Sequence, residues 1–218
     1  MASGTMSVRC TTTLSSHQTT TLSRRPTNAH WERLNLSENS WRNIVDLPYL
    51  MGRAYTVALQ SPDPSNQNGA LLIDSHEGGI LSEGHNGFGK IPFSWNDLTD
   101  RDKKLAFIEH AERACLFECA KNYQTDGSIM VCPWACCTDC GRAIARCGVE
   151  KVIVHGARMA TTPDRWKKSV EDGLSCLTHY GVELEYYEGP IELPTDFTIK
   201  ANGKDWSPHV LTSSDEAR

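Results

Sequence analysis

Residues 110–140 read HAERACLFECAKNYQTDGSIMVCPWACCTDC, and this stretch decides the fold. Its ends carry His110-Ala-Glu112 and Cys137-Thr-Asp-Cys140, and the apolar run 129–131 between them predicts a buried strand. The periodicity on either side predicts one helix from His110 to Lys121 and another from about Cys137 to Cys147. The stretch therefore indicates a helix, a strand and a second helix, with a reactive group at the start of each helix.

The rest of the chain extends this alternation of helices and strands. Apolar residues with helical spacing run from Trp41 to Ala58, with Pro48 suited to a first turn. Short apolar runs predict strands at 70–73, 80–83, 151–155 and 182–187, and a further helix opens at Thr162-Pro163. Because helical crossovers join parallel strands, this order predicts an α/β fold, a three-layer α/β/α sandwich around a mixed five-stranded sheet.

Composition divides the chain into three parts. Residues 1–38 are polar, and the first thirty contain no Asp or Glu. Such a segment cannot offset its ordering entropy by burial, so we expect a flexible arm. The alternative interpretation is an organelle transit peptide, since those are rich in Arg and Ser and poor in acids. Residues 39–188 form the predicted α/β domain, and residues 189–218 form a tail expected to pack on it.

Charge and cysteine usage limit the classes of function. The formal net charge of −5 argues against a protein that grips long nucleic acid through its phosphates, although a few local cations can hold one small anion. No stretch approaches the roughly 18 consecutive apolar residues of a membrane span. Seven of the nine cysteines lie between Cys115 and Cys147. This clustered set favours reduced thiols and metal ligands, and hence the cytoplasm, or the host cytoplasm for a viral protein.

The histidine and cysteine motifs predict a zinc site. A catalytic zinc takes three protein ligands and keeps a fourth position for water, and His110, Cys137 and Cys140 would supply one imidazole and two thiolates. A helix amino terminus favours thiolate through its backbone N–H groups. Glu112, two residues after the histidine, is placed to move protons between the water and a substrate without binding the metal itself.

A closed structural zinc site is the alternative reading of these motifs. Such a site needs a fourth ligand, and Cys136 and Cys132 are close enough in sequence to supply one. A purely structural site, however, has no use for an acid two residues from the histidine. The pattern therefore favours a catalytic zinc with Glu112 as the catalytic residue.

The segment from Tyr49 to His155 resembles the deoxycytidylate (dCMP) deaminase family of the cytidine deaminase-like superfamily, and is most similar to phage and bacterial members. The matching pieces, in the family's order, are Asp63-Pro-Ser-Asn-Gln67 with Gly69-Ala70, Gly84-His-Asn-Gly-Phe88, His110-Ala-Glu-Arg113 and Pro133-Trp-Ala-Cys-Cys-Thr-Asp-Cys140. Three positions depart from the family: Cys136 and Gly89 replace usual prolines, and His85 replaces a usual tyrosine.

The resemblance implies roles for residues around the zinc. Asn86 would hydrogen-bond the deoxyribose, the Ala111 N–H would hold the base O2, and the Ala135 carbonyl would accept from the departing amine. Trp134 would support the pocket floor. A tight turn at Asn86 and ordinary core packing of Trp134 are the alternatives. In the family, the region of Gly84, His85 and Gly87 helps to bind regulatory dCTP or dTTP.

The function that follows is zinc-dependent hydrolysis of dCMP to dUMP and ammonia, by a homo-oligomer that the resemblance implies is often a hexamer. The alternatives are a deaminase of cytidine, deoxycytidine, dCTP or a nucleic-acid base, and a non-catalytic zinc- or nucleotide-binding protein. A nucleotide substrate requires a cation for its 5′-phosphate. The candidates are Lys90, Arg113, Arg53 and Arg142, together with a backbone nest at 61–65.

Overall fold

The computed structural model describes residues 45–90, 94 and 99–209. The predicted arm, residues 1–38, lies outside the described residues, as do Trp41 and Ile44 of the first predicted helix. The helices are α1 (Leu47–Ala58), α3 (Arg101–Phe107), α4 (Ala111–Cys119), α5 (Thr138–Arg146), α6 (Gly156–Ala160) and α7 (Asp164–His179). The strands are β1 (Gly69–Ile73), β2 (Ile80–His85), β3 (Ile129–Val131), β4 (Lys151–His155), β5 (Glu183–Tyr187), β6 (Ile199–Ala201) and β7 (Lys204–Trp206).

Five strands form one mixed sheet, as the sequence predicts, and the structure places them in the order β2-β1-β3-β4-β5. Strand β1 pairs antiparallel with both β2 and β3, whereas β3, β4 and β5 run parallel. Every residue of β1, β3 and β4 is buried, as expected for central strands covered on both faces. Strands β6 and β7 form a separate hairpin.

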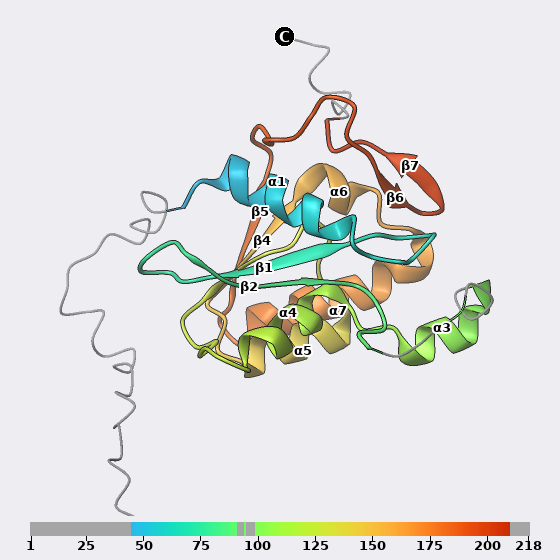
Figure 1. The fold of residues 1–218 in the computed structure, drawn as a ribbon. Coiled ribbons are helices and arrows are strands. Elements are labelled where there is room, and N and C mark those ends of the chain that lie inside the picture. The colour runs from blue at the N-terminus through green and yellow to red at the C-terminus, as the bar shows by residue number, and fades with distance from the viewer. Residues whose placement is uncertain (1–44, 91–93, 95–98, 210–218) are drawn as a thin grey trace, which may run out of the picture. The chain divides into compact units, whose positions relative to one another are not determined.

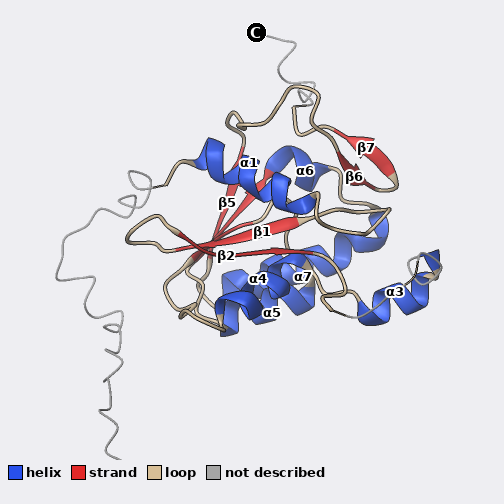
Figure 2. Ribbon diagram, in the orientation of Figure 1, coloured by secondary structure: helices blue, strands red, loops and turns tan. Residues whose placement is uncertain are grey.

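Helices cover both faces of this sheet (Figures 1 and 2). Successive side chains of a strand point to opposite faces, so Val152 and Val154 pack with α4, α5 and α7 while Ile153 packs with α1. The face that carries α1 also receives Ile199 and Trp206 of the C-terminal segment. The predicted three-layer sandwich is therefore confirmed, with the C-terminal hairpin added beside α1.

Local signals explain where α1 begins. The Asp46 carboxylate accepts a hydrogen bond from the Tyr49 N–H, and Pro48 lies in the first turn, where its missing N–H costs nothing. The face of α1 that includes Met51, Ala54 and Tyr55 is fully buried against the sheet. Among the described residues, no helix is long and apolar enough to cross a membrane.

The end of β3 positions the site. Strand β3 has an antiparallel neighbour on one side and a parallel neighbour on the other. Ligands of α/β proteins bind beyond the carboxyl ends of the strands, where the direction of connection changes. The segment from β3 to α5 emerges at this point, and both α4 and α5 begin beside it.

Candidate active site

Three side chains converge where helices α4 and α5 begin. His110 and Cys137 are the N-cap residues of these helices, and Cys140 lies in the first turn of α5. The His110 Nδ1 atom is 3.4 Å from Cys137 Sγ and 3.5 Å from Cys140 Sγ. The three ligand atoms all lie within 4.8 Å of one another. One imidazole nitrogen and two sulfurs at this spacing fit a zinc ion.

The environment of Cys137 favours its thiolate form. The Cys140 thiol donates a hydrogen bond to Cys137 Sγ and the His110 ring also faces it, which lowers the pKa of Cys137 to about 3. Thiolate is the form of cysteine that binds metal. This pair of cysteines therefore suits a cation between them.

The alternative fourth ligands do not join this cluster. Within the described part of the chain, no further His, Cys, Asp or Glu lies with His110, Cys137 and Cys140 in the group that could hold a metal. Cys132 is buried, and its sulfur accepts instead from Asn68 Nδ2 at 3.4 Å. Cys136 is buried in the apolar core. The cluster thus offers three protein ligands, as a catalytic zinc requires.

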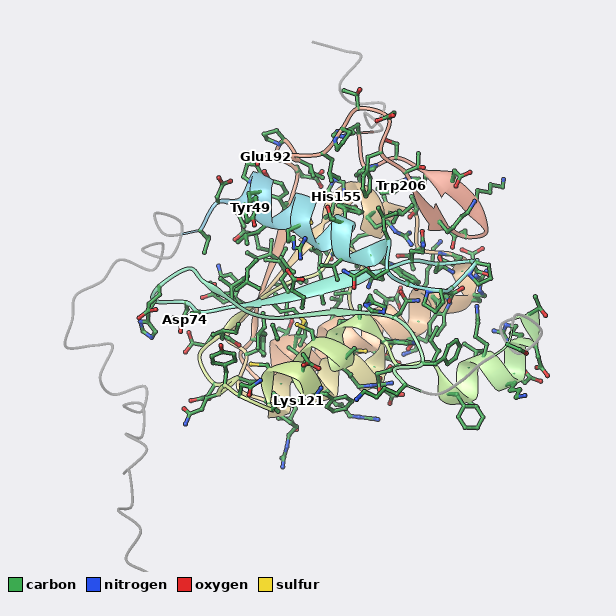
Figure 3. All side chains as sticks on the ribbon, in the orientation of Figure 1. Tyr49, Asp74, Lys121, His155, Glu192 and Trp206 are labelled. Atoms are coloured by element: carbon green, nitrogen blue, oxygen red, sulfur yellow. The ribbon has the colours of Figure 1, made fainter. Side chains whose placement is uncertain are left out.

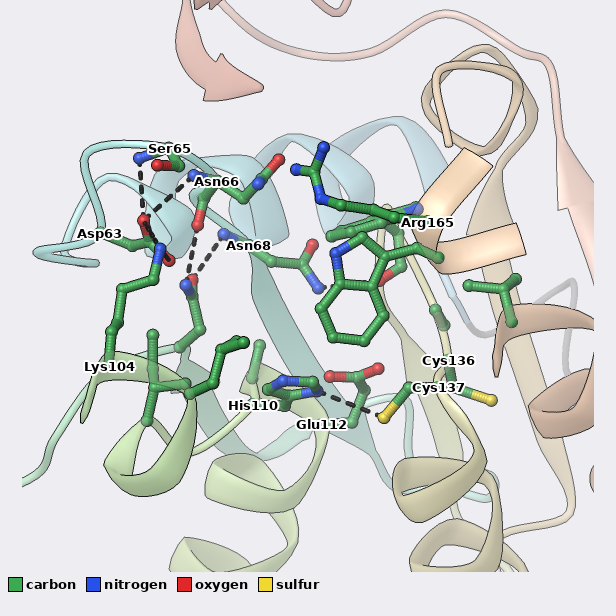
Figure 4. Close-up of a pocket in the computed structure, with 18 of the residues that line it drawn as sticks. Asp63, Ser65, Asn66, Asn68, Lys104, His110, Glu112, Cys136, Cys137 and Arg165 are labelled. Carbon is green, nitrogen blue, oxygen red and sulfur yellow. Dashed lines mark hydrogen bonds and ion pairs between the residues drawn. The ribbon is translucent and has the colours of Figure 1, made fainter. Parts of the chain in front are cut away.

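Glu112 lies in the first turn of α4 beside the three ligands, and Figure 4 shows its carboxylate between His110 and Cys137. Its side chain is only 3% exposed, and burial raises the pKa of this carboxyl. A carboxyl whose pKa lies closer to neutrality exchanges protons more readily at neutral pH. The geometry therefore suits Glu112 to proton transfer.

Helix α7 packs directly against the segment that carries the cysteines. A Cβ atom on Gly173 would lie 2.2 Å from the Cys136 carbonyl oxygen and 2.7 Å from that of Cys137. Only glycine permits this approach, because any side chain would displace the backbone that holds Cys137. The absence of a side chain at Gly173 thus contributes to the position of a ligand 36 residues earlier in the chain.

A pocket of about 580 Å³ opens above the cluster. Its size is that of a site for a small molecule. His110, Glu112 and Cys137 line its base, and the loop from Asp63 to Asn66 lines one wall. Trp134 and Trp166 also line the pocket, and their indole rings pack edge to face with ring centres 6.4 Å apart. The pocket therefore has reactive side chains at its bottom and flat apolar rings in its walls.

The four residues for which the resemblance implies contacts with the substrate all line this pocket: Asn86, Ala111, Trp134 and Ala135. The Asn86 amide is held on both sides, since Oδ1 accepts from the Asn68 N–H and Nδ2 donates to the Asn66 carbonyl, each at 2.8 Å. The Trp134 Nε1 donates to Thr162 Oγ1 at 2.9 Å. All four residues thus lie together around one pocket, and their contacts with a substrate stay a prediction.

Gly84, His85 and Gly87, the expected nucleotide effector region, do not line the pocket themselves, although Asn86 between His85 and Gly87 does. A Cβ on Gly84 would lie 2.3 Å from the Cys115 backbone nitrogen, so this glycine permits close packing of β2 on α4. Gly87 forms an isolated bridge with Glu109. Packing thus gives Gly84 a structural role, whereas a Cβ on Gly87 would make only ordinary contacts, 3.5 Å from the His85 and Pro62 side chains.

The cations expected to hold a phosphate are placed elsewhere. Arg53 binds Glu83 through two hydrogen bonds, Arg113 pairs with Glu109 and Arg142 pairs with Asp139, and neither these three nor Lys90 lines the pocket. The pocket instead contains Arg101, Lys104 and Arg165. Sequence reasoning missed these three, because their side chains meet only through tertiary contacts.

The loop at 61–65, expected to form a backbone nest, turns its N–H groups inward. The Ser65 and Asn66 N–H groups donate to Asp63 Oδ1 at 2.8 and 3.3 Å, and Lys104 Nζ lies 3.1 Å from the same oxygen. Asp63 thus neutralises Lys104 and occupies the nest.

Comparison with known proteins identifies the family. The family described as "Cytidine and deoxycytidylate deaminase zinc-binding region" matches residues 45–156, which include all three metal ligands and Glu112. The chain belongs to this deaminase family. The match covers the sheet from β1 to β4 together with the helices that begin at the ligands.

Similar proteins within this deaminase family include curated and solved examples. Deoxycytidylate deaminases from Homo sapiens and Pongo abelii are each 27% identical over 111 residues, which cover 48% of this chain and 61% of the relative. The chain thus spans about three fifths of the length of the curated relatives that it matches.

Among solved structures, the dCMP deaminase of cyanophage S-TIM5 in complex with dCMP and dUMP is 28% identical, with a TM-score of 0.50. The likeness covers 63% of this chain and 93% of that one. The apo form of the same phage enzyme, aligned at 24% identity and a TM-score of 0.50, supports the cytidine deaminase-like fold alone.

Proposed function

We propose that this protein hydrolyses dCMP to dUMP and ammonia, with a zinc ion held by His110, Cys137 and Cys140. The observation that carries the proposal is a buried carboxylate, Glu112, beside a cluster of metal donors at the base of a pocket, a cluster that has three members among the described residues. Membership of the deaminase family supports the reaction, and the phage relative solved with dCMP and dUMP supports the substrate.

Glu112 carries the proton chemistry in this proposal. When bound, zinc lowers the pKa of a coordinated water to about 7 and so supplies a nucleophile at neutral pH. As the water oxygen bonds to C4 of the cytosine ring, the Glu112 carboxylate would take one water proton and pass it to N3. It would then move the remaining hydroxyl proton to the amine, so that the C4–N bond breaks and ammonia leaves. Its burial excludes bulk water from these transfers.

Backbone groups orient the base. The Ala111 N–H, at the start of α4, has no acceptor within the helix and is assigned to the base O2, while the Ala135 carbonyl is assigned to the exocyclic amine. Asn86, already held by two hydrogen bonds, keeps one amide hydrogen for the deoxyribose. Rigid donors and acceptors of this kind select an orientation at little entropic cost.

Arg165 is the cation that best suits the 5′-phosphate. Lys104 is bound to Asp63 through both carboxylate oxygens, at 3.1 and 3.2 Å. Within the described residues, no hydrogen bond or ion pair engages the Arg165 guanidinium, which Figure 4 shows directed toward the Asn66 side of the pocket. It also lies in the first turn of α7, whose N-cap residue Pro163 makes no capping hydrogen bond. A guanidinium beside a free helix N-terminus favours a phosphate.

A substrate panel tests the function. The zinc-loaded protein should convert dCMP at least about tenfold more efficiently, in kcat/KM, than deoxycytidine, dCTP or single-stranded DNA, since one phosphate contact contributes on the order of 1.4 kcal/mol. Ammonia release and zinc content are measured on the same sample. Efficient conversion of another base with dCMP unchanged would refute the substrate, and no conversion at all would leave a non-catalytic zinc protein.

Arg165→Gln tests the phosphate contact. We expect the KM for dCMP to rise about tenfold while the kcat/KM for deoxycytidine stays unchanged, because only dCMP carries the phosphate. Lys168→Gln on the same helix is the matched control, since Lys168 pairs with Asp172 and does not line the pocket. Equal losses for dCMP and deoxycytidine in Arg165→Gln would remove Arg165 from the phosphate site.

The proposal extends to assembly and compartment. A homo-oligomer, with dCTP and dTTP as effectors at Gly84, His85 and Gly87, follows from the resemblance to dCMP deaminases. A reducing compartment such as the cytoplasm is supported by the eight cysteines of the described residues, all of which are free thiols.

A further inference from the structure

Arg158 carries a positive charge in the interior of the protein. Its side chain is 0% exposed, and within the described residues no carboxylate pairs with it and its Nε atom has no hydrogen-bond partner. Burial lowers the pKa of Arg158 to about 10, so the guanidinium stays charged at neutral pH. A buried charge without an ion partner costs considerable free energy, and its neighbours must provide the compensation.

Two indole rings and two polar side chains surround this guanidinium. Its carbon atom lies 4.7 Å from the centre of the Trp134 ring and 5.7 Å from that of Trp206, which are cation–π contacts. Nη1 donates to Thr161 Oγ1, and Nη2 lies 3.5 Å from Asn66 Oδ1. Arg158 therefore joins the pocket residues Trp134 and Asn66 from behind the pocket wall.

These contacts belong to a closed circuit of five residues, which we call the Arg158 ring: Arg158, Asn66, Asn86, Asn68 and Trp134. From Arg158 the ring passes to the Asn66 side chain, and the Asn66 carbonyl accepts from Asn86 Nδ2. Asn86 Oδ1 accepts from the Asn68 N–H, and Asn68 Nδ2 donates to the Trp134 carbonyl at 2.8 Å. The Trp134 indole then closes the ring on Arg158. Four members line the pocket, and Arg158 alone does not.

The C-terminal hairpin covers the outer side of this ring. Asn202, in the turn between β6 and β7, donates from its N–H to Asn66 Oδ1 and from Nδ2 to the Thr161 carbonyl, both at 2.9 Å. Trp206 of β7 lies against His155, and both are labelled in Figure 3. The Tyr55 hydroxyl and His155 Nδ1 share a 2.6 Å hydrogen bond, and burial lowers the pKa of His155 to about 4. His155 is therefore neutral beside Arg158 and adds no second charge.

We propose that Arg158 is a positioning residue, whose guanidinium holds Asn66 and the Trp134 indole in place and thereby fixes the Asn86 amide that faces the substrate. The inference rests on the proposed function in naming the substrate as dCMP and in assigning Asn86 to it. Because Asn86 receives its orientation through Asn66 and Asn68, a loss of Arg158 frees one side of the pocket wall while the metal ligands, on α4 and α5, stay in place.

Two substitutions test this inference in the full zinc-loaded chain. Arg158→Met fills a similar volume without charge, and we expect the KM for dCMP to rise about tenfold, with kcat within about twofold of wild type and zinc content unchanged. Arg158→Lys keeps the charge over Trp134 but lacks the planar fork that reaches both Asn66 and Thr161, so its KM should be intermediate. Ile153→Ala, a buried change on the α1 side of the sheet, controls for general destabilisation and should leave the KM unchanged.

Hydrogen exchange of the Asn86 side-chain amide, followed by NMR without substrate, separates this inference from the proposed function. We expect protected amide protons in wild type and at least about tenfold faster exchange in Arg158→Met, because the hydrogen bond to Asn66 is loosened. If wild type fails to deaminate dCMP but the exchange changes as expected, the proposed function fails and the ring stands. Unchanged exchange and unchanged KM in both variants, or a loss of zinc or kcat alone, would overturn the positioning role.

Discussion

Glu112→Gln should lower turnover of dCMP by about 10³-fold or more, within the range by which a positioned acid–base group accelerates a reaction. The side-chain amide of the introduced glutamine cannot accept a proton from water or pass it to the cytosine ring. Because Glu112 is not one of the three clustered metal donors and glutamine has nearly the same shape, zinc content and dCMP binding should stay close to wild type. Steady-state kinetics, metal analysis and equilibrium binding of dCMP to the variant measure the three quantities.

Glu118→Gln is the matched control for this change. Glu118 lies on the same helix, α4, and pairs with Lys121 at the surface. The same chemical substitution there should leave kcat and KM unchanged, since a surface ion pair contributes little. Retained activity in Glu112→Gln would contradict the assigned proton transfer, whereas loss of zinc would make Glu112 part of the metal site.

Cys137→Ser should abolish zinc retention and, with it, activity. The serine hydroxyl is a much poorer ligand than the thiolate favoured at this position. Mutation of a residue that only hydrogen-bonds a metal ligand costs roughly 10- to 100-fold in metal affinity. Loss of a direct ligand should therefore cost more than about 100-fold. Zinc content after dialysis against a competing chelator measures the effect.

Cys136→Ser is the matched control, one residue away. Cys136 is 1% exposed in the apolar core, and burial raises the pKa of its thiol, so it is not prepared to bind metal. We expect this variant to unfold at a lower temperature, because a buried hydroxyl replaces a thiol, and yet to keep its zinc. If Cys136→Ser loses zinc and Cys137→Ser retains it, the assignment of ligands is shifted by one residue.

The sequence predicted the elements whose signals are local. The predicted strands 129–131 and 151–155 coincide with β3 and β4, because both are short apolar runs buried on two faces. The helix predicted from His110 to Lys121 begins one residue later, with His110 as its N-cap. This difference matters chemically, since an N-cap residue has extended backbone and directs the imidazole toward Cys137.

The elements that were not predicted include α3 and the β6–β7 hairpin, for different physical reasons. Helix α3 buries none of its residues, so it has no apolar stripe to reveal it. The strands of the β6–β7 hairpin have three residues each and depend on distant partners. The Lys200 N–H, for example, donates to Oε1 of Gln67, which lies 133 positions earlier in the chain. Neither propensity nor spacing contains that information.

The sequence by itself determined the sheet and the chemical groups of the site, because covalent spacing fixes which donors begin helices α4 and α5 and which acid follows the histidine. Only the tertiary structure decided which cations enter the pocket: carboxylates hold Arg53, Arg113 and Arg142 outside it, and folding brings Lys104 and Arg165 in. It also decided that Arg158 lies behind Trp134. These outcomes depend on contacts between residues far apart in the chain, whose geometry is set by packing and not by local sequence.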